Sequence, residues 1–171
     1  MFAVRVLLQA LMSRTAVIIL NTLGIVYCIS LLLKISPSIY GYSGHIDEGV
    51  ITALNGIATV FVALGVVYEE RETILHKIAK STPRPYDDYL NNVAHEDGLG
   101  LLVLGLFVEI MTISIETPNK FLDTSGVEYT LLLTSFGLIA ISIIIQFDLL
   151  KDYFKTYFSN KSYINFQKSE H

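Results

Sequence analysis

The sequence is short of charged residues and of cysteine, and each shortage excludes a class of protein. Charged residues make up 16% of the 171-residue chain, whereas a soluble domain usually carries about 25%. The Lys and Arg residues form no basic stripe and no basic tail, so nothing indicates nucleic-acid binding. The single cysteine, Cys28, excludes an internal disulfide framework and a cysteine-based zinc site.

Several catalytic and transport signatures are also missing. The chain has no Gly-rich phosphate loop, no nucleophile elbow, no pair of cysteines and no ladder of arginines within an apolar segment. Histidine is absent from the core of every apolar segment, which argues against bis-histidine haem ligation in a membrane. The sequence therefore predicts no cofactor and favours a protein that is not an enzyme.

Long apolar segments dominate what the chain does contain. Hydrophobic residues make up 52% of it, and its mean hydropathy is +0.53. A helix of about 20 residues crosses a bilayer, and four segments have that length, namely residues 15–33, 49–68, 98–115 and 129–147. The sequence therefore predicts an all-α integral membrane protein, in which a single membrane domain forms a four-transmembrane-helix bundle.

Lysine and arginine residues indicate how this bundle is oriented. Only Lys34 and Lys120 fall in the two connections on one side, and all the other Lys and Arg residues fall on the opposite side. Cytoplasmic segments carry the excess of Lys and Arg, which predicts cytoplasmic N and C termini. This bias, together with the absence of eukaryotic sorting signals, favours a prokaryotic plasma (inner) membrane.

The segments outside the four spans are also predicted to be largely helical. Residues 1–14 should form an interfacial helix or an extension of the first span. Residues 69–80 are good helix formers without Gly or Pro, so the second helix should continue through them into the cytoplasm. A cytoplasmic helix and loop thus occupy residues 69–97, and residues 150–171 form a cytoplasmic tail.

One carboxylate lies within an apolar segment. Glu109 belongs to the third span, where an ionised carboxylate costs from about 2.5 kcal/mol upward. A heptad spacing places it on one helix face with nearly all the small or polar residues of this span, Gly100 and Ser114 excepted, together with one leucine: His95, Gly98, Leu102, Gly105, Thr112 and Glu116. This face should contact other helices, because glycines let a neighbouring helix come close.

The other spans offer small and polar residues to meet this face. Asn21, Gly24 and Cys28 lie in span one, and Ser135, Ser142 and Gln146 lie in span four. Asn55 in span two lies at a depth similar to that of Glu109, which makes it the predicted neighbour. The candidates for an ion or proton pathway are Glu109, Asn55, Thr59, Thr112 and Glu116. The candidates for helix packing are Gly98, Gly105, Gly56 and Gly24.

A weaker constellation lies at the predicted cytoplasmic ends of spans two and three. Carboxylate and imidazole groups on facing helices can hold a metal ion, and the candidates here are Glu69, Glu72, His76, His95 and Glu96. The paired Glu-x-x-His elements that would make such a site specific are missing. Solvated helix ends with i,i+4 pairs explain the same residues, so a metal ion is only an alternative to no cofactor.

Three functions from different classes follow from these patterns. The sequence favours a structural or accessory subunit of a membrane assembly, because the chain offers surfaces for binding a partner and contains no recognisable catalytic motif. The second function is a homo-oligomeric proton or cation pathway that uses Glu109. The third is a membrane-bound metalloprotein with a cytoplasmic Glu/His site. The predicted partners are the lipid bilayer and either further copies of the chain or a larger membrane complex.

Overall fold

The computed structural model describes five parts of the chain: residues 10, 13–37, 46–74, 85–116 and 127–169. The surroundings of side chains are described for all of these residues except 85–88 and 157–169. The predicted helix over residues 1–14 therefore lies almost entirely outside the described residues.

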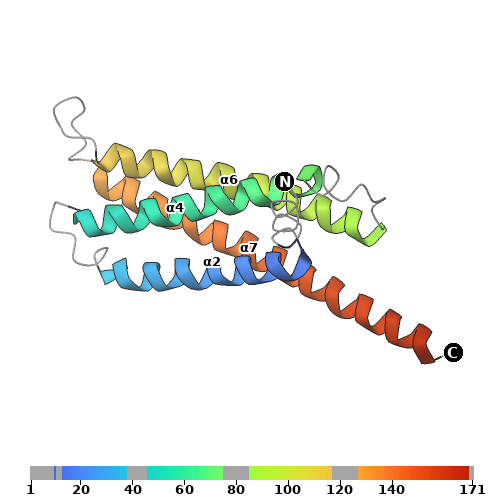
Figure 1. Cartoon of the computed structure of the whole chain (residues 1–171). Helices are drawn as coiled ribbons and strands as arrows, with labels where there is room; N and C mark the ends of the chain where they lie inside the picture. Colours follow the sequence, from blue (N-terminus) through green and yellow to red (C-terminus); the bar gives the residue numbers. More distant parts are fainter. Residues whose placement is uncertain (1–9, 11–12, 38–45, 75–84, 117–126, 170–171) are drawn as a thin grey trace.

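Four long helices make up most of the described chain: α2 (Arg14–Ile35), α4 (Glu48–Glu69), α6 (Pro85–Glu116) and α7 (Glu128–Ser169). Successive helices run in opposite directions (Figure 1). Each helix is long and apolar enough to cross a membrane, so the prediction of an all-α chain with four such helices is confirmed. Each predicted apolar segment lies within one of them.

Local chemistry explains where three of the helices begin. The hydroxyl of Ser13 accepts a hydrogen bond from the Ala16 N–H at 3.2 Å, and it caps α2. The carboxylate of Asp47 accepts from the Gly49 N–H at 2.6 Å, and it caps α4. Such caps satisfy N–H groups that the first turn of a helix leaves free. Helix α6 begins at Pro85, whose fixed φ and missing N–H suit the first helical position.

The second helix is shorter than the sequence predicted. Helix α4 ends at Glu69, and Glu70 has φ −84° and ψ 0°, after which residues 71–74 form a separate helical turn. In this turn the Arg71 side chain contacts Asn91 on α6 and Tyr153 on α7. The helices that do extend well beyond their apolar segments are α6, at its N-terminal end, and α7, at its C-terminal end.

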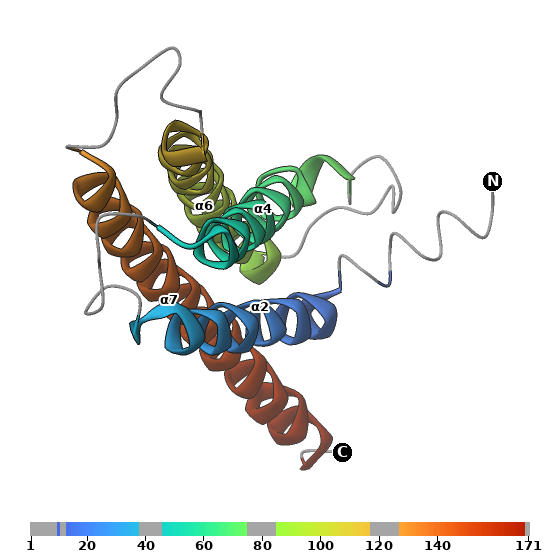
Figure 2. The same cartoon turned by 90° about the vertical axis from the view of Figure 1, so that its left-hand side faces the viewer.

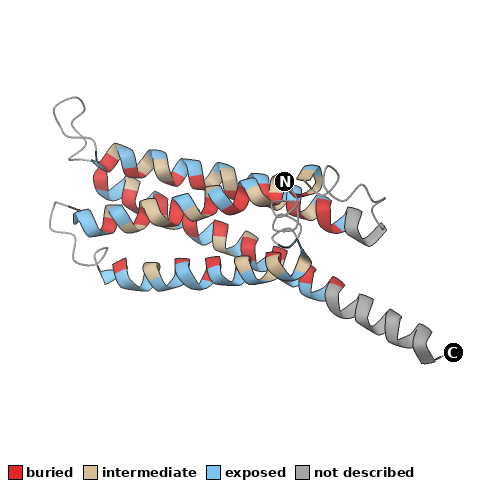
Figure 3. Ribbon diagram, viewed as in Figure 1, coloured by how far each residue is buried: buried red, intermediate tan, exposed pale blue. Residues whose placement is uncertain are grey.

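The four helices pack unequally. Figures 1 and 2 show α4 and α6 lying against each other, α7 crossing beside them, and α2 on the far side of α4 from α6. In the most apolar part of α4, 44% of the residues are buried, against 28% in α2. Figure 3 shows the same contrast, because exposed residues run along most of α2. Helix α2 is therefore the span that packs least extensively against the other helices.

Glycines bring the backbones of α4 and α6 together. A Cβ atom added at Gly65 would lie 2.6 Å from the backbone nitrogen of Leu102 and 2.7 Å from the carbonyl oxygen of Gly98. A Cβ added at Gly98 would lie 2.7 Å from the backbone nitrogen of Glu69. Lipid offers no hydrophobic driving force between helices, so close van der Waals contact of this kind stabilises the pair.

Candidate functional site

The buried face of α6 is rotated relative to the face predicted from the sequence. Three members of the predicted face are buried: Gly98, Gly105 and Thr112. The side chains of the other four are exposed or only partly buried, although the backbone of Leu102 lies where α4 and α6 approach most closely: His95, Leu102, Glu109 and Glu116. Their places are taken by Leu101, Val108 and Ile115. The rotation follows from α7, which packs against the side of α6 away from Glu109, as the contact between Gly100 and Ile145 shows.

The register of α4 and α6 determines which residue lies opposite Glu109. Nδ1 of His95 lies 3.4 Å from the carbonyl oxygen of Glu69 at the margin of the helix pair. Glu109 is two heptads further along α6 than His95, and Asn55 is two heptads back along α4 from Glu69. Two heptads return each helix to the same face, and the helices are antiparallel. Glu109 and Asn55 therefore lie at the same level on the same margin.

We call Asn55, Thr59 and Glu109 the polar edge of the α4–α6 pair. Asn55 and Glu109 are partly buried and Thr59 is exposed. The Oδ1 atom of Asn55 is buried without a hydrogen-bond partner. Among the described residues, Glu109 makes no side-chain hydrogen bond, and so none to Asn55. The hydroxyl of Thr59 donates to the carbonyl oxygen of Asn55 at 2.9 Å. The described residues thus leave the Glu109 carboxyl and Oδ1 of Asn55 without a hydrogen-bond partner.

The remaining pathway candidates lie elsewhere. Thr112 is buried in the centre of the α6 contact face, and its hydroxyl donates to the carbonyl oxygen of Val108 at 2.6 Å. Glu116 is exposed and is the last residue of α6. The five candidates therefore do not line one surface, and only Asn55, Thr59 and Glu109 share the polar edge.

Two of the candidate packing glycines lie on the α2 side of the molecule. A Cβ added at Gly24 would lie 2.8 Å from Cδ1 of Leu64 on α4. A Cβ added at Gly56 would lie 3.1 Å from the hydroxyl oxygen of Tyr27 on α2. Both glycines meet side chains, which can shift, whereas Gly65 and Gly98 meet backbone.

The predicted metal ligands are only partly brought together. His95 approaches Glu69 through the backbone carbonyl and not the carboxylate. Glu72 lies in the turn after α4, Glu96 is exposed, and His76 lies outside the described residues. Within the described residues, no three His, Cys, Asp or Glu side chains are placed to hold a metal ion. The metal site stays a prediction.

A buried arginine joins three helices at the end of α4, and the sequence analysis missed it. Arg71 is 3% exposed. Its guanidinium donates to Oδ1 of Asn91 on α6 and lies 5.7 Å from the ring centroid of Tyr153 on α7, a charge-assisted hydrogen bond combined with a cation–π contact. Arg71 continues the buried stripe of α4 through Leu64 and Tyr68, and that spacing is the signal that identifies it.

Acidic residues gather where α6 extends beyond its apolar segment. Asp97 immediately precedes residues 98–115 and is partly buried. Burial and, to a smaller extent, the nearby carboxylates of Asp152, Asp148 and Glu96 together raise the pKa of Asp97 to about 6. Asp152 and Asp148 belong to α7. Ionisation of Asp97 therefore opposes close packing of α6 against α7 at this end.

Comparisons of the chain with protein-family models, with curated proteins and with solved structures gave no match. The function is therefore argued from the site itself.

Proposed function

We propose that the protein is a structural or accessory subunit of a membrane assembly, and that the polar edge contacts a neighbouring helix. One observation carries the proposal: Glu109 and Asn55 share a level within apolar segments, and among the described residues neither the Glu109 carboxyl nor Oδ1 of Asn55 has a hydrogen-bond partner. A polar group left unsatisfied in hydrocarbon costs several kcal/mol. A polar side chain from an adjacent polypeptide would remove that cost for the partly exposed Glu109 carboxyl, whereas Oδ1 of Asn55 is buried within the chain.

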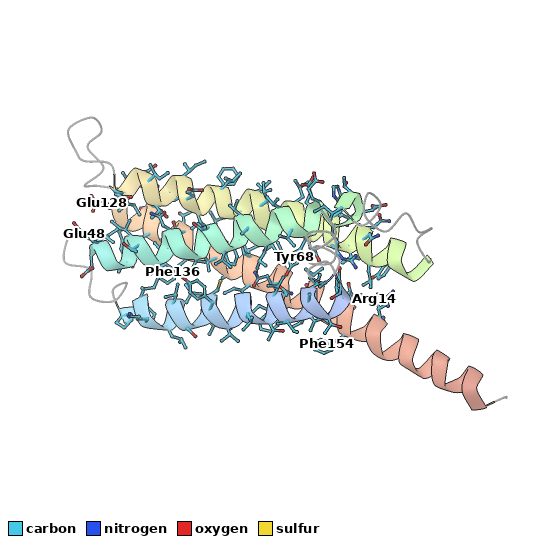
Figure 4. All side chains as sticks on the ribbon, in the orientation of Figure 1. Arg14, Glu48, Tyr68, Glu128, Phe136 and Phe154 are labelled. Carbon is cyan, nitrogen blue, oxygen red and sulfur yellow. The ribbon has the colours of Figure 1, made fainter. Side chains whose placement is uncertain are left out.

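The proposal places the four helices across the membrane as a bundle with both termini in the cytoplasm. Arg14, Tyr68 and Phe154 lie toward one end of the molecule, and Glu48 and Glu128 lie at the other (Figure 4). Arg14, Arg71, Lys151 and Lys155 belong to the helix ends on the first side and Lys34 to the other, and this excess supports a cytoplasmic location for the first end. The plasma membrane of a prokaryote fits this pattern.

The partner consistent with this edge is a transmembrane helix that presents a hydrogen-bonding side chain at the depth of Glu109. A further copy of the chain or a foreign subunit would supply such a helix. An internal alternative exists, because a protonated Glu109 that turned toward Asn55 would donate to its free Oδ1. The two arrangements differ in a measurable way, since only the first makes assembly depend on Glu109.

The composition of the protein extracted with its native lipid tests the proposal. Wild type, Glu109→Leu and Glu109→Gln would be extracted in lipid nanodiscs and weighed by native mass spectrometry. Ser114→Ala is the matched control, because the Ser114 hydroxyl is already bonded to the carbonyl oxygen of Ile110 at 2.8 Å. We expect wild type and Ser114→Ala to carry further subunits. Glu109→Leu should dissociate at least tenfold more readily, which corresponds to about 1.4 kcal/mol, and Glu109→Gln should retain most of the assembly.

Two results would contradict the proposal. One is a wild-type protein that is monomeric in its native lipid. The other is a Glu109→Leu variant that is as fully assembled as wild type, because assembly would then not need the carboxyl. If Glu109→Leu and Asn55→Leu lower the free energy of unfolding but leave assembly unchanged, the internal pair between Glu109 and Asn55 is the correct arrangement.

The carboxyl itself favours a second function, a homo-oligomeric proton or cation pathway. Acids within spans often carry protons or ions, and Glu109 is the one charged residue of the four apolar segments. In a ring of copies the polar edges would line a shared path. Proton and cation flux into proteoliposomes tests this function, with conduction expected for wild type and its loss expected for Glu109→Gln. If neither wild type nor Glu109→Gln conducts protons or cations, this second function is wrong.

A further inference from the structure

Helices α2, α4 and α7 meet around the side chain of Gln146. Asn21 and Gln146 are both 0% exposed, and Nδ2 of Asn21 donates to the backbone carbonyl oxygen of Gln146 at 2.8 Å. Gly24 lies about one turn further along α2. A Cβ added there would lie 3.7 Å from Nε2 of Gln146 and 2.8 Å from Cδ1 of Leu64. The Gln146 amide is thus buried beside Gly24 of α2, and Leu64 of α4 packs against the same glycine.

Three polar side-chain atoms at this junction are buried without a hydrogen-bond partner: Oδ1 of Asn21, Oε1 of Gln146 and Nε2 of Gln146. The Asn21 amide cannot be turned over to help, because its Nδ2 already donates to the Gln146 carbonyl. Turning the Gln146 amide over only exchanges its two atoms. Buried polar groups almost always find a partner in the protein or in ordered water, so the protein atoms alone leave this junction incomplete.

We infer that a water molecule is bound at this junction. Its two O–H groups would donate to Oδ1 of Asn21 and Oε1 of Gln146, and its oxygen would accept from Nε2 of Gln146. Buried waters typically make about three hydrogen bonds of this kind. A metal cation does not fit, because two neutral oxygens do not replace its hydration shell and the Nε2 donor repels it. An anion does not fit, because two of the three atoms are acceptors.

The bound water links α2 to the rest of the molecule. Helix α2 has the smallest buried share of the four spans, and its Asn21 side chain donates a hydrogen bond to α7. The water extends this hydrogen bond into a network on both amides. The position of α2 therefore depends on hydration inside the membrane-spanning part of the chain.

NMR of the full-length protein in lipid nanodiscs tests this inference through contacts between water protons and side-chain amides. The protein carries ¹⁵N in its Asn and Gln side chains. Gln146→Met, which has similar length and no amide, identifies the Gln146 signal by its disappearance. Should this variant not fold, through-bond correlations within α7 of the wild type assign the same signal.

We expect a cross peak between water and the Nε2 protons of Gln146 in the wild type, and its loss in Asn21→Leu. Ser142→Ala is the matched control on α7, because the Ser142 hydroxyl bonds to the carbonyl oxygen of Leu138 at 3.0 Å. This control should keep the cross peak. An assigned Gln146 amide without water contact, or one in direct contact with the Asn21 side chain in place of water, overturns the inference.

Discussion

The α4–α6 contact and the α2–α7 contact hold helices together by opposite means. Gly65 and Gly98 join α4 to α6 through the absence of side chains, so that backbone meets backbone. Asn21 and Gln146 join α2 to α7 through side-chain amides. An added methyl group disrupts the first kind of contact at once, whereas water or a new neighbour can repair the second. The α4–α6 pair should therefore be the rigid unit and α2 the helix that moves.

The largest effect is expected when a methyl group is placed between α4 and α6. In Gly65→Ala the new Cβ meets backbone atoms of Leu102 and Gly98, which cannot turn away as a side chain would. Overpacking of this kind costs about 1–3 kcal/mol and sometimes more, and we expect the free energy of unfolding to fall by about 3 kcal/mol. Denaturant unfolding in detergent micelles measures this loss.

Gly137→Ala is the matched control for the glycine contact. A Cβ added at Gly137 meets nothing within 4 Å, and alanine is a better helix former than glycine by about 1 kcal/mol. This variant should therefore unfold no more easily than wild type. If Gly65→Ala were as stable as Gly137→Ala, the close approach of α4 and α6 would be wrong.

The contrast between the two contacts also shows which features of the fold can be predicted from the sequence. Length and hydropathy predicted all four helices, because span length and low charge are properties of the chain itself. Heptad spacing placed Gly98 and Gly105 on a contact face, because glycine is informative wherever helices pack closely. The same spacing placed Glu109 on that face as well, and the structure moves it to the margin.

The features that escaped prediction depend on neighbours that are distant in the sequence. The rotation of α6 is determined by where α7 packs. The end of α4 at Glu69 accompanies the turn of Arg71 toward Asn91 and Tyr153, which lie on two other helices. The helical propensity of residues 69–80 favoured an unbroken helix; the structure interrupts it at Glu70, and residues 75–80 lie outside the described part of the chain. The pairing of Asn21 with Gln146 likewise joins residues 125 positions apart.

A smaller effect is expected when the hydrogen bond between α2 and α7 is removed. Cys28 lies on α2 and is 0% exposed, so its reaction with a membrane-permeant maleimide reports local opening of this helix. Asn21→Leu removes a hydrogen bond that contributes about 0.6 kcal/mol and up to about 1.7 kcal/mol within membranes. The labelling rate should therefore rise about threefold, and by up to about eighteenfold.

Gly98→Ala sharpens the comparison, because it disturbs the α4–α6 pair and leaves the Asn21 contact intact. It should lower the free energy of unfolding but leave the labelling rate of Cys28 close to that of wild type under native conditions. Equal acceleration of labelling by both variants would mean that the two contacts open together, and that α2 is not a separate unit.

The smallest effect is expected at Asp97, where α6 meets α7 beyond its apolar segment. The folded protein raises the pKa of Asp97 to about 6, against about 3.9 in an unfolded chain. Below pH 4 the group is protonated in both states, and above pH 6 it is ionised in both. Between these values the folded state binds the proton more tightly, so stability should rise as the pH falls from 6 to 4.

Thermal unfolding in detergent at pH 4.5 and pH 7 checks the direction of this pH dependence. The quantity compared is the difference in stability between wild type and Asp97→Asn. The variant has no carboxyl at this position, so it should be the more stable protein at pH 7 and should lose that advantage at the lower pH. Asp97 is partly exposed, and solvent screening should keep the difference below about 1 kcal/mol. A wild type that instead gains on the variant as the pH rises would show that a cation stabilises the ionised Asp97. The end of the α6–α7 contact would then be held by an ion pair and not weakened by like charges.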